Sequence, residues 1–300
     1  MKNLKLISCF WLLYVLSSCS ADSESVDVTN DVEITHFNYR SVGADGSISN
    51  PTQYELQNNR IIRVTKGNQT LQEYFYENNS ISEILTYTSG VLTSKENYFY
   101  ENDELVEYKT ANYSPNYPST YKYLFTHTND TIFSELHQSN DGINFEILSE
   151  SKIVLVNNDR VYFEDRTMND LHTTIIQSTY DGNGNPVSEI LQYNGLIMTP
   201  QTKHITYDST LNAYGLVMEK TYGRKNLMLL HHTLQNAINH VSVKTLSRNN
   251  ILTFEQSSFQ NVSFEIIHDI NANNFSDQTI YKAYVDNQPW DHFLYEFYFN

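Results

Sequence analysis

Three oxygen-bearing residues at alternate positions, Asp181, Asn183 and Asn185, have the opening spacing of a calcium-binding loop. Such a loop also needs a glycine at its sixth position and a bidentate acid at its twelfth. Here the sixth position is Pro186 and the twelfth is Gln192. The segment is better interpreted as a hairpin turn, and the sequence predicts neither a metal nor a cofactor there.

The histidines do not form a recognisable metal-binding motif. His231 and His232 are adjacent, so their side chains point to opposite faces of a strand or diverge by about 100° around a helix. Neither arrangement lets both bind one metal ion. The other histidines are scattered, so we predict no metal site from sequence spacing; a site assembled from distant strands stays open.

Catalytic residues are equally hard to find. No Gly-x-Ser-x-Gly elbow is present. Acidic neighbours such as Glu164 and Asp165 exist, but a glycosidase needs two carboxyl groups facing each other about 5 to 9.5 Å apart, which neighbours in one strand do not establish. We therefore favour a non-enzymatic protein, with a hydrolase of extracellular polymers as the alternative.

Tyrosine is unusually frequent, with 23 residues, and two aromatic triplets stand out, Tyr74-Phe75-Tyr76 and Tyr98-Phe99-Tyr100. In a strand the outer two residues of each triplet share a face. Tyr74, Tyr76, Tyr98 and Tyr100 are therefore candidates for an aromatic platform that binds a glycan or a peptide. The favoured alternative is that they pack one face of a sheet.

The charge balance excludes one class of partner. Lys2 and Lys5 are the only charged residues in positions 1–18, so the chain from Cys19 carries 17 basic and 35 acidic side chains, a formal charge of −18. Nucleic-acid phosphates and anionic lipid headgroups both require a basic surface. We expect no nucleic-acid partner.

The N-terminus has the composition of an export signal. Lys2 and Lys5 precede an apolar run, Leu6 to Leu16, and small residues follow it. Eleven apolar residues are about half of the ~20 that a membrane-spanning helix needs. The sequence thus predicts a signal peptide over residues 1–18.

The tetrad Leu16-Ser17-Ser18-Cys19 resembles the lipobox of bacterial lipoproteins. The resemblance implies that Cys19 is acylated and becomes the mature N-terminus. Since each buried methylene contributes about 0.8 kcal/mol, several acyl chains would anchor the protein permanently. With Cys9 removed and Cys19 acylated, no disulfide is expected.

Residues 19–30 are small, polar and acidic, which predicts a flexible tether. An acidic, serine-rich stretch behind the lipid cysteine also resembles the surface-export signal of Bacteroidetes-type lipoproteins. That resemblance implies a cell-envelope protein of the outer membrane and leaves surface exposure, the leaflet and the oligomeric state open.

The rest of the chain alternates apolar and polar residues, as in Val262 to Ile266 and Phe293 to Phe299, which is typical of strands. Asn- and Asp-rich turn signals separate such runs, among them Asn58-Asn59, Asn78-Asn79 and Asn249-Asn250. Lys225 to Gln235 is the one candidate helix, and strand competes with it there.

A degenerate repeat of 20 to 24 residues, about one hairpin, starts at Gln57, Glu77 and Glu101. A further unit, Tyr180-Asp181-Gly182-Asn183-Gly184-Asn185, resembles the Tyr-Asp-x-x-Gly-Asn core of the YD repeats of RHS-type proteins. In it, Gly184 would take the positive-φ position, Asp181 would accept turn N–H groups and Tyr180 would pack on the strand before it. Tyr207 to Tyr214 resembles an element of uncharacterised flavobacterial lipoproteins.

Together these patterns predict one all-β domain over residues 31–300. It should be an antiparallel meander of hairpin repeats, forming a long twisted sheet or a partly closed barrel-like shell. The expected role is an outer-membrane lipoprotein that binds or scaffolds an extracellular glycan or protein. A purely structural shell is the third interpretation.

Overall fold

The structure, a computed structural model, describes residues 32–43, 46–113, 118–157, 160–168, 172–194, 200–235, 245–257 and 262–300 of the 300-residue chain. Val32–Asn300 forms one compact unit. The predicted signal peptide, the tether and Cys19 lie outside the described residues.

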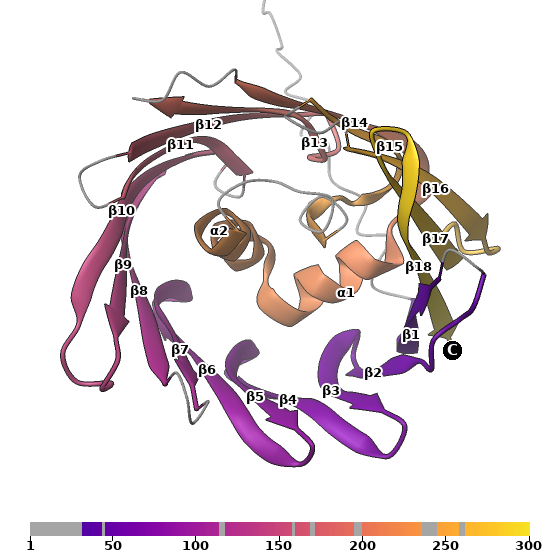
Figure 1. The fold of residues 1–300 in the computed structure, drawn as a ribbon, viewed down its shortest axis with the longest axis horizontal. Helices are drawn as coiled ribbons and strands as arrows, with labels where there is room; N and C mark the ends of the chain where they lie inside the picture. The colour runs from indigo at the N-terminus through magenta and orange to yellow at the C-terminus, as the bar shows by residue number, and fades with distance from the viewer. Residues whose placement is uncertain are drawn as a thin grey trace, which may run out of the picture. The chain divides into compact units, whose positions relative to one another are not determined.

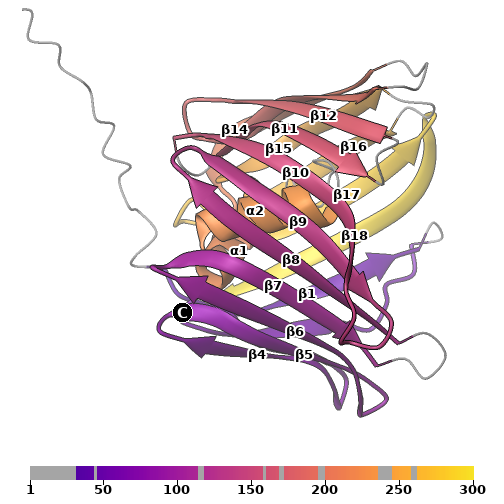
Figure 2. The ribbon, with the colours of Figure 1, turned by 90° about the vertical axis from the view of Figure 1, so that its left-hand side faces the viewer.

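Over the described residues, eighteen strands pair antiparallel in chain order, and β1 pairs with β18 to close the sheet into a barrel (Figure 1). Figure 2 shows the strands crossing the wall obliquely, as closure of a sheet requires. The expected antiparallel meander is therefore confirmed, and its barrel-like form is the correct one: the sheet has no free edge.

The strands are β1 (Ile34–Val42), β2 (Thr52–Gln57), β3 (Arg60–Lys66), β4 (Gln69–Glu77), β5 (Ser80–Thr88), β6 (Val91–Glu101), β7 (Glu104–Asn112), β8 (Ser119–Thr128), β9 (Thr131–Ser139), β10 (Glu146–Val156), β11 (Arg160–Met168), β12 (His172–Tyr180), β13 (Pro186–Asn194), β14 (Gln201–Leu211), β15 (Asn249–Ser257), β16 (Val262–Ile270), β17 (Ser276–Val285) and β18 (Gln288–Phe299).

The repeated Asn turns join consecutive strands because both of their residues adopt positive φ. Asn58 and Asn59 have φ of 52° and 59°, and Asn78 and Asn79 have 47° and 73°. Two consecutive positive φ values match the twist of a hairpin, and asparagine tolerates them better than most residues. The turn predicted at Asn249-Asn250 is wrong, because these buried residues begin β15.

Two helices, α1 (Ala213–Tyr222) and α2 (Arg224–Gln235), lie inside the ring of strands (Figure 1). The helix expected over Lys225 to Gln235 is confirmed as α2, and the competing strand interpretation is wrong. The sequence analysis missed α1. Ala213 and Val217 are buried on one side of the helix, but Tyr214, Leu216 and Met218 also pack against the core from other sides, so the one-faced periodicity that reveals most helices is lacking.

The start of α1 shows why it forms where it does. The side chain of Asn212 caps it by accepting the N–H of Gly215 at 3.1 Å. A Cβ at Gly215 would lie 2.2 Å from the carbonyl oxygen of Ser247, so only glycine lets the helix approach that segment. The helix is therefore built to pack inside the barrel.

The barrel interior is an apolar core. One cluster packs Phe37, Phe254 and Phe297 around Val217 of α1. A second packs strand residues such as Ile84 against Leu229 of α2. Burying one side chain of this size contributes about 1.5–3 kcal/mol to stability. The described residues contain no cysteine, so their stability comes from this core and not from disulfides.

The outer face of the wall carries charged side chains on most strands, between exposed apolar ones such as Phe75, Phe99 and Phe133. Because Tyr39 and Tyr295 point into the core, their neighbours Arg40 and Glu296 point outward, and their side chains pair at 2.8 Å. The same alternation places charges outside on strand after strand. They include Glu55, Arg63, Glu73, Glu83, Lys95, Lys109, Lys122, Glu135, Lys152, Asp165, Glu255, Glu265 and Lys282.

Candidate functional site

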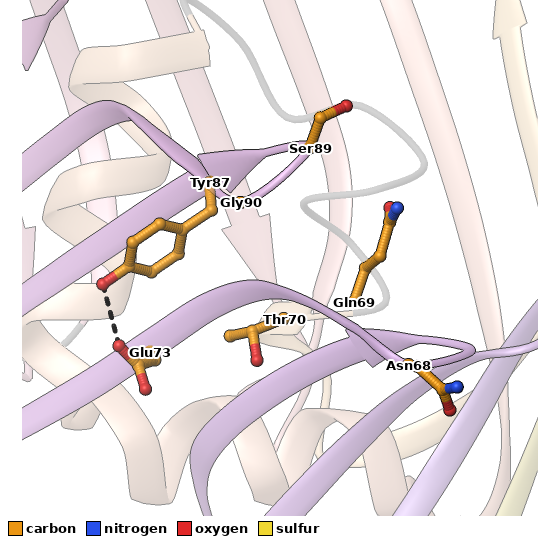
Figure 3. A pocket seen from close by; sticks show the side chains of 7 residues that line it. All are labelled: Asn68, Gln69, Thr70, Glu73, Tyr87, Ser89 and Gly90. Atoms are coloured by element: carbon orange, nitrogen blue, oxygen red, sulfur yellow. Dashed lines mark hydrogen bonds between the residues drawn. The ribbon is translucent and has the colours of Figure 1, made fainter.

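An open hollow on the outer face lies between the tips of the β3–β4 and β5–β6 hairpins (Figure 3). Its volume is about 510 Å³. We call it the hairpin-tip hollow. Its lining residues are Asn68, Gln69, Thr70, Glu73, Tyr87, Ser89 and Gly90.

Turn chemistry shapes this hollow. Gly67 and Gly90 have φ of +58° and +77°, a region that side chains rarely allow. Ser89, with φ 51°, completes the second turn. Both hairpins therefore reverse tightly, and the residues beside the turns are left at the rim with their side chains exposed or half-buried.

The hollow holds one fixed acid. The hydroxyl of Tyr87 donates to Oε2 of Glu73 at 2.8 Å, so each side chain orients the other. This hydrogen bond is the main cause of the raised pKa of Tyr87, because it stabilises the protonated phenol. The lining residues contain amides, hydroxyls and one carboxylate but no basic group. Such a set can hydrogen-bond a polar ligand.

The four tyrosines predicted as a platform point elsewhere. Tyr74, Tyr76, Tyr98 and Tyr100 face the barrel interior, where they belong to or pack against the core around α2. Burial is the main cause of the raised pKa of each, to about 12 for Tyr76. Their rings lie on the opposite face of the sheet from Glu73, so they do not take part in the hairpin-tip hollow.

Inside the barrel, Tyr98 and Tyr108 share one acid. Oε2 of Glu96 accepts the hydroxyls of Tyr98 at 2.7 Å and Tyr108 at 3.1 Å. The hydroxyl of Tyr74 donates to Gln72 at 3.1 Å. These contacts satisfy polar groups that the core would otherwise leave unpaired.

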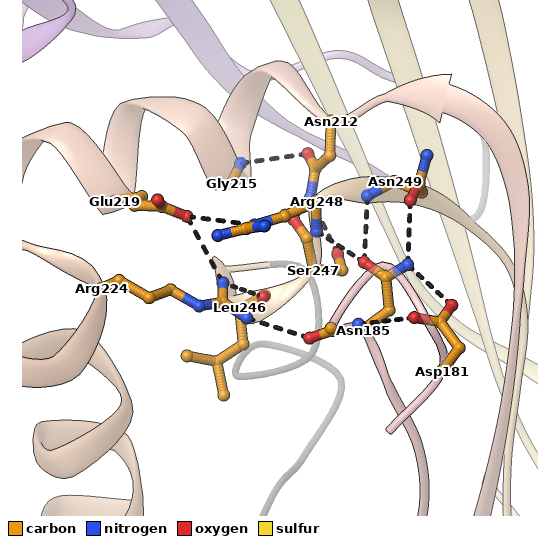
Figure 4. A network of polar contacts seen from close by, with 11 residues as sticks. Asp181, Asn185, Asn212, Gly215, Glu219, Arg224, Leu246, Ser247, Arg248 and Asn249 are labelled. Atoms are coloured by element: carbon orange, nitrogen blue, oxygen red, sulfur yellow. Dashed lines mark hydrogen bonds and ion pairs between the residues drawn. The ribbon is translucent and has the colours of Figure 1, made fainter. Parts of the chain in front are cut away.

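The turn at Tyr180 to Asn185 belongs to a second polar site (Figure 4). Oδ1 of Asp181 accepts the N–H groups of Asn183 and Asn185, both at 2.9 Å, and Gly184 has φ +83°. The hydroxyl of Tyr180 reaches back to the carbonyl of Val161. Because the carboxylate of Asp181 faces N–H donors, its geometry fits a turn and does not fit a calcium ligand.

This turn fastens the inner helices to the wall. Asn185 is fully buried, donates to Asn249 at 2.9 Å and accepts the N–H of Arg248 at 2.7 Å. Arg224 of α2 donates to the carbonyls of Gly184 and Leu246. The arrangement is a structural joint, shown in Figure 4.

The sequence analysis missed a second turn of the same kind. Oδ1 of Asn271 accepts the N–H groups of Asn273 and Phe275, as Asp181 does in the first turn. Asn274 has φ 64° and takes the place of Gly184. The repeat pattern could not find it, because Ile270 and Phe275 replace the tyrosine and the final asparagine, and Asn replaces both Asp and Gly.

The acidic neighbours Glu164 and Asp165 do not act together. Glu164 faces inward, is fully buried and pairs with Arg166 at 2.5 Å. Asp165 is on the outer face opposite Lys152. A second buried pair joins Glu189 and Lys203 at 2.6 Å inside the wall.

Among the described residues, no three His, Cys, Asp or Glu side chains are grouped so that they could hold a metal ion. In the same part of the chain, no helix has the length and apolar character needed to cross a membrane.

Neither a protein-family model nor a curated protein sequence matches this chain. Among solved structures, it is similar to a porin-like protein from Bacteroides vulgatus ATCC 8482, with 10% identity, a TM-score of 0.45, and coverage of 90% of this chain and 99% of that one. A porin-like protein from Bacteroides uniformis ATCC 8492 gives 9% identity, a TM-score of 0.32, and coverage of 89% and 98%. Likeness this distant carries no argument about function.

Proposed function

We propose that this protein is an outer-membrane lipoprotein whose barrel stands in water, held to the membrane by an acylated Cys19. In this proposal it acts as a non-enzymatic binding or scaffolding module for an extracellular glycan or protein. The observation that carries the proposal is the polarity of the barrel, whose core is mainly apolar and whose outer face has charged side chains on most strands.

A barrel that spans a membrane needs an apolar band about 25 Å tall on its outer face, and a basic side chain at the bilayer midplane there costs about 2–4 kcal/mol. Here Lys95 and Glu83 pair at 2.5 Å on the outer face, and Lys282 and Glu265 pair at 3.1 Å. Repeated around the wall, such charges would make lipid contact very unfavourable. The outer face of the wall is therefore better suited to contact with water than with lipid.

In this proposal, the N-terminus attaches the barrel to the membrane. Twelve residues lie between Cys19, the mature N-terminus in this proposal, and Val32, a span of at most about 45 Å when fully extended. The carbonyl of Val32 accepts the side-chain amide of Asn59 at 2.8 Å, so the chain enters the barrel at the rim of the Asn58-Asn59 turn. A barrel tethered this way would remain close to the membrane surface.

Binding is favoured over catalysis by the way the acids are distributed. Within the described residues, Glu164 and Asp165 are split across the wall, and the hairpin-tip hollow offers Glu73 as its one carboxylate. A hydrolase of glycans typically needs two carboxyl groups in one cleft. The hollow is suited to holding a ligand.

The anchor is tested by labelling cells with radioactive palmitate and separating their membranes. The full-length protein should take up label and remain in the outer-membrane fraction after an alkaline carbonate wash. Cys19→Ala should lose the label and its outer-membrane location, whereas Cys9→Ala, the matched control, should change neither.

The position of the barrel is tested by inserting a specific protease site between residues 22 and 26. Cleavage of isolated outer membranes should release the barrel into buffer without detergent. If the cleaved barrel stays in the membrane, the wall itself contacts lipid and the proposal is wrong. Protease treatment of intact cells then decides which leaflet carries the protein.

A further inference from the structure

We propose that the hairpin-tip hollow is a binding subsite for one neutral sugar unit of an extracellular polysaccharide. The inference rests on the proposed binding function and names its ligand class and residues. Tyr87 would supply an aromatic surface, and Glu73, Asn68 and Gln69 would supply hydrogen bonds.

The first argument is the fixed aromatic ring. A sugar ring has apolar C–H faces bordered by hydroxyl groups, so it binds best where an aromatic side chain lies beside polar groups. The hydroxyl of Tyr87 is tied to Oε2 of Glu73 at 2.8 Å, which holds the ring in place (Figure 3). A ring held before binding loses little conformational freedom when a ligand arrives.

The second argument is unused hydrogen-bonding capacity. Among the described residues, the side chains of Asn68, Gln69 and Ser89 form no hydrogen bond, and Oε1 of Glu73 forms none. Amides both donate and accept, whereas a carboxylate accepts only. Hydroxyl groups, which donate and accept, complement this set.

The third argument is charge and size. The lining has one carboxylate and no basic residue, in a chain whose formal net charge is −16, so an anionic sugar would be repelled. Small-molecule sites usually measure about 300–1,000 Å³, and the hollow measures about 510 Å³. The open rim would let a longer polymer continue beyond the bound unit.

The fourth argument is position. The Gly67 and Gly90 turns are at the opposite end of β3 to β6 from the Asn58-Asn59 turn, beside which the chain enters the barrel. In the tethered arrangement, the hollow would lie on the rim away from the anchor. That rim is the one that an extracellular polymer would reach first.

The chain offers a matched control on the same outer face. The hydroxyl of Tyr284 donates to Oε2 of Glu265 at 3.0 Å, which repeats the Tyr87–Glu73 contact. There, however, Lys282 also contacts Oε2 of Glu265, at 3.1 Å. Because the lysine already occupies this carboxylate, substitutions of the control pair should not affect sugar binding.

The test is calorimetric titration of the purified full-length protein with neutral oligosaccharides of glucose, mannose, xylose and galactose. We expect at least one of them to bind. Tyr87→Ala and Glu73→Gln should each weaken that binding at least tenfold, while Tyr284→Ala and Glu265→Gln should leave it within twofold. Far-UV circular dichroism should show that all four variants fold like the unmodified protein.

Three outcomes overturn the inference in different ways. Binding that is unchanged in Tyr87→Ala and Glu73→Gln would retain the proposed binding function and remove the hollow as its site. If, in a parallel titration, the protein binds spermidine and none of the oligosaccharides, and Glu73→Gln loses that binding, the hollow is a cation site. An absence of binding to every neutral oligosaccharide at millimolar concentration would reject the sugar ligand, while the anchor and protease tests would still decide the tethered barrel on their own.

Discussion

The hydroxyl of Tyr76 donates a hydrogen bond of 2.7 Å to the carbonyl oxygen of Ile61. The ladder between β3 and β4 ends at the pair Arg63 and Glu73, so the carbonyl of Ile61 lies beyond it and Tyr76 takes the place of a strand partner. Four other side chains bind a backbone carbonyl just beyond the end of a strand ladder in the same way. The pairs are His127 with Leu105, Tyr180 with Val161, Tyr207 with Pro186 and His268 with Ile251. This contact explains why an aromatic or imidazole side chain precedes so many of the turns.

Removing this hydroxyl should therefore destabilise the barrel. Tyr76→Phe, Tyr180→Phe and Tyr207→Phe should each lower the free energy of unfolding by about 1–3 kcal/mol, because a buried carbonyl loses its donor. Urea titration monitored by circular dichroism measures this change. The built-in control is Tyr100→Phe, because the buried hydroxyl of Tyr100 has no hydrogen-bond partner. A loss in Tyr100→Phe as large as in Tyr76→Phe would contradict the explanation.

Two substitutions of Asp181 should destabilise its turn by different amounts. Asp181→Asn should cost less than Asp181→Ala, because its amide oxygen can still accept both backbone N–H groups, as that of Asn271 does, although the bond from Nδ2 of Asn185 to Oδ2 is lost. Asp181→Ala should cost about 1–3 kcal/mol, because the N–H groups of Asn183 and Asn185 lose their acceptor. Thermal unfolding measured side by side distinguishes them. Equal losses would show that the carboxylate charge matters more than the acceptor.

The buried pair of Glu189 and Lys203 should be sensitive to loss of one partner. Lys203→Met should lower the free energy of unfolding by about 3–5 kcal/mol, because it leaves a carboxylate buried without its lysine. The matched surface substitution is Lys95→Met, which breaks the partly exposed pair with Glu83 on the outer face and should cost about 0–1 kcal/mol. Denaturant titration of both variants checks the difference. Similar losses would mean that Glu189 does not depend on Lys203.

His268 should make stability depend on pH. Its Nε2 donates to the carbonyl of Ile251 and its Nδ1 contacts the hydroxyl of Thr279, both at 2.9 Å. Burial lowers its pKa below the usual 6.5, opposed by the Ile251 carbonyl and the charge of Asp208. The unfolded chain therefore binds the proton more readily, so this contribution to stability is complete above about pH 6.5 and is lost as the pH falls below it.

His268→Gln should flatten that dependence between pH 7 and pH 5, as followed by the melting temperature at half-unit intervals. A slope that persists in His268→Gln would assign the pH dependence to other groups.

Local features of this barrel could be predicted because they depend on neighbours in sequence. The Asn58-Asn59 and Asn78-Asn79 turns need only residues that tolerate positive φ, and α2 reveals itself by the spacing of its leucines. The polar turn at Asp181 is likewise complete within five residues.

Long-range features needed the tertiary structure. Closure depends on β1 pairing with β18, where Phe37 meets Phe297, and no local pattern contains that pairing. In the aromatic triplets, alternation separates the residues into two faces of the sheet, but it does not determine which face lies inside the barrel. Likewise, Glu73 and Tyr87 are 14 residues apart and meet only because β4 and β5 pair in this register.

The sequence by itself therefore determined the hairpins, their turns, one inner helix and the acidic charge, since each is a short-range property of the chain. The tertiary structure alone decided that the sheet closes, that α1 and the tyrosines fill its interior, and that charges cover its outer face. Those properties come from burial, and burial is set by contacts between residues far apart in the chain.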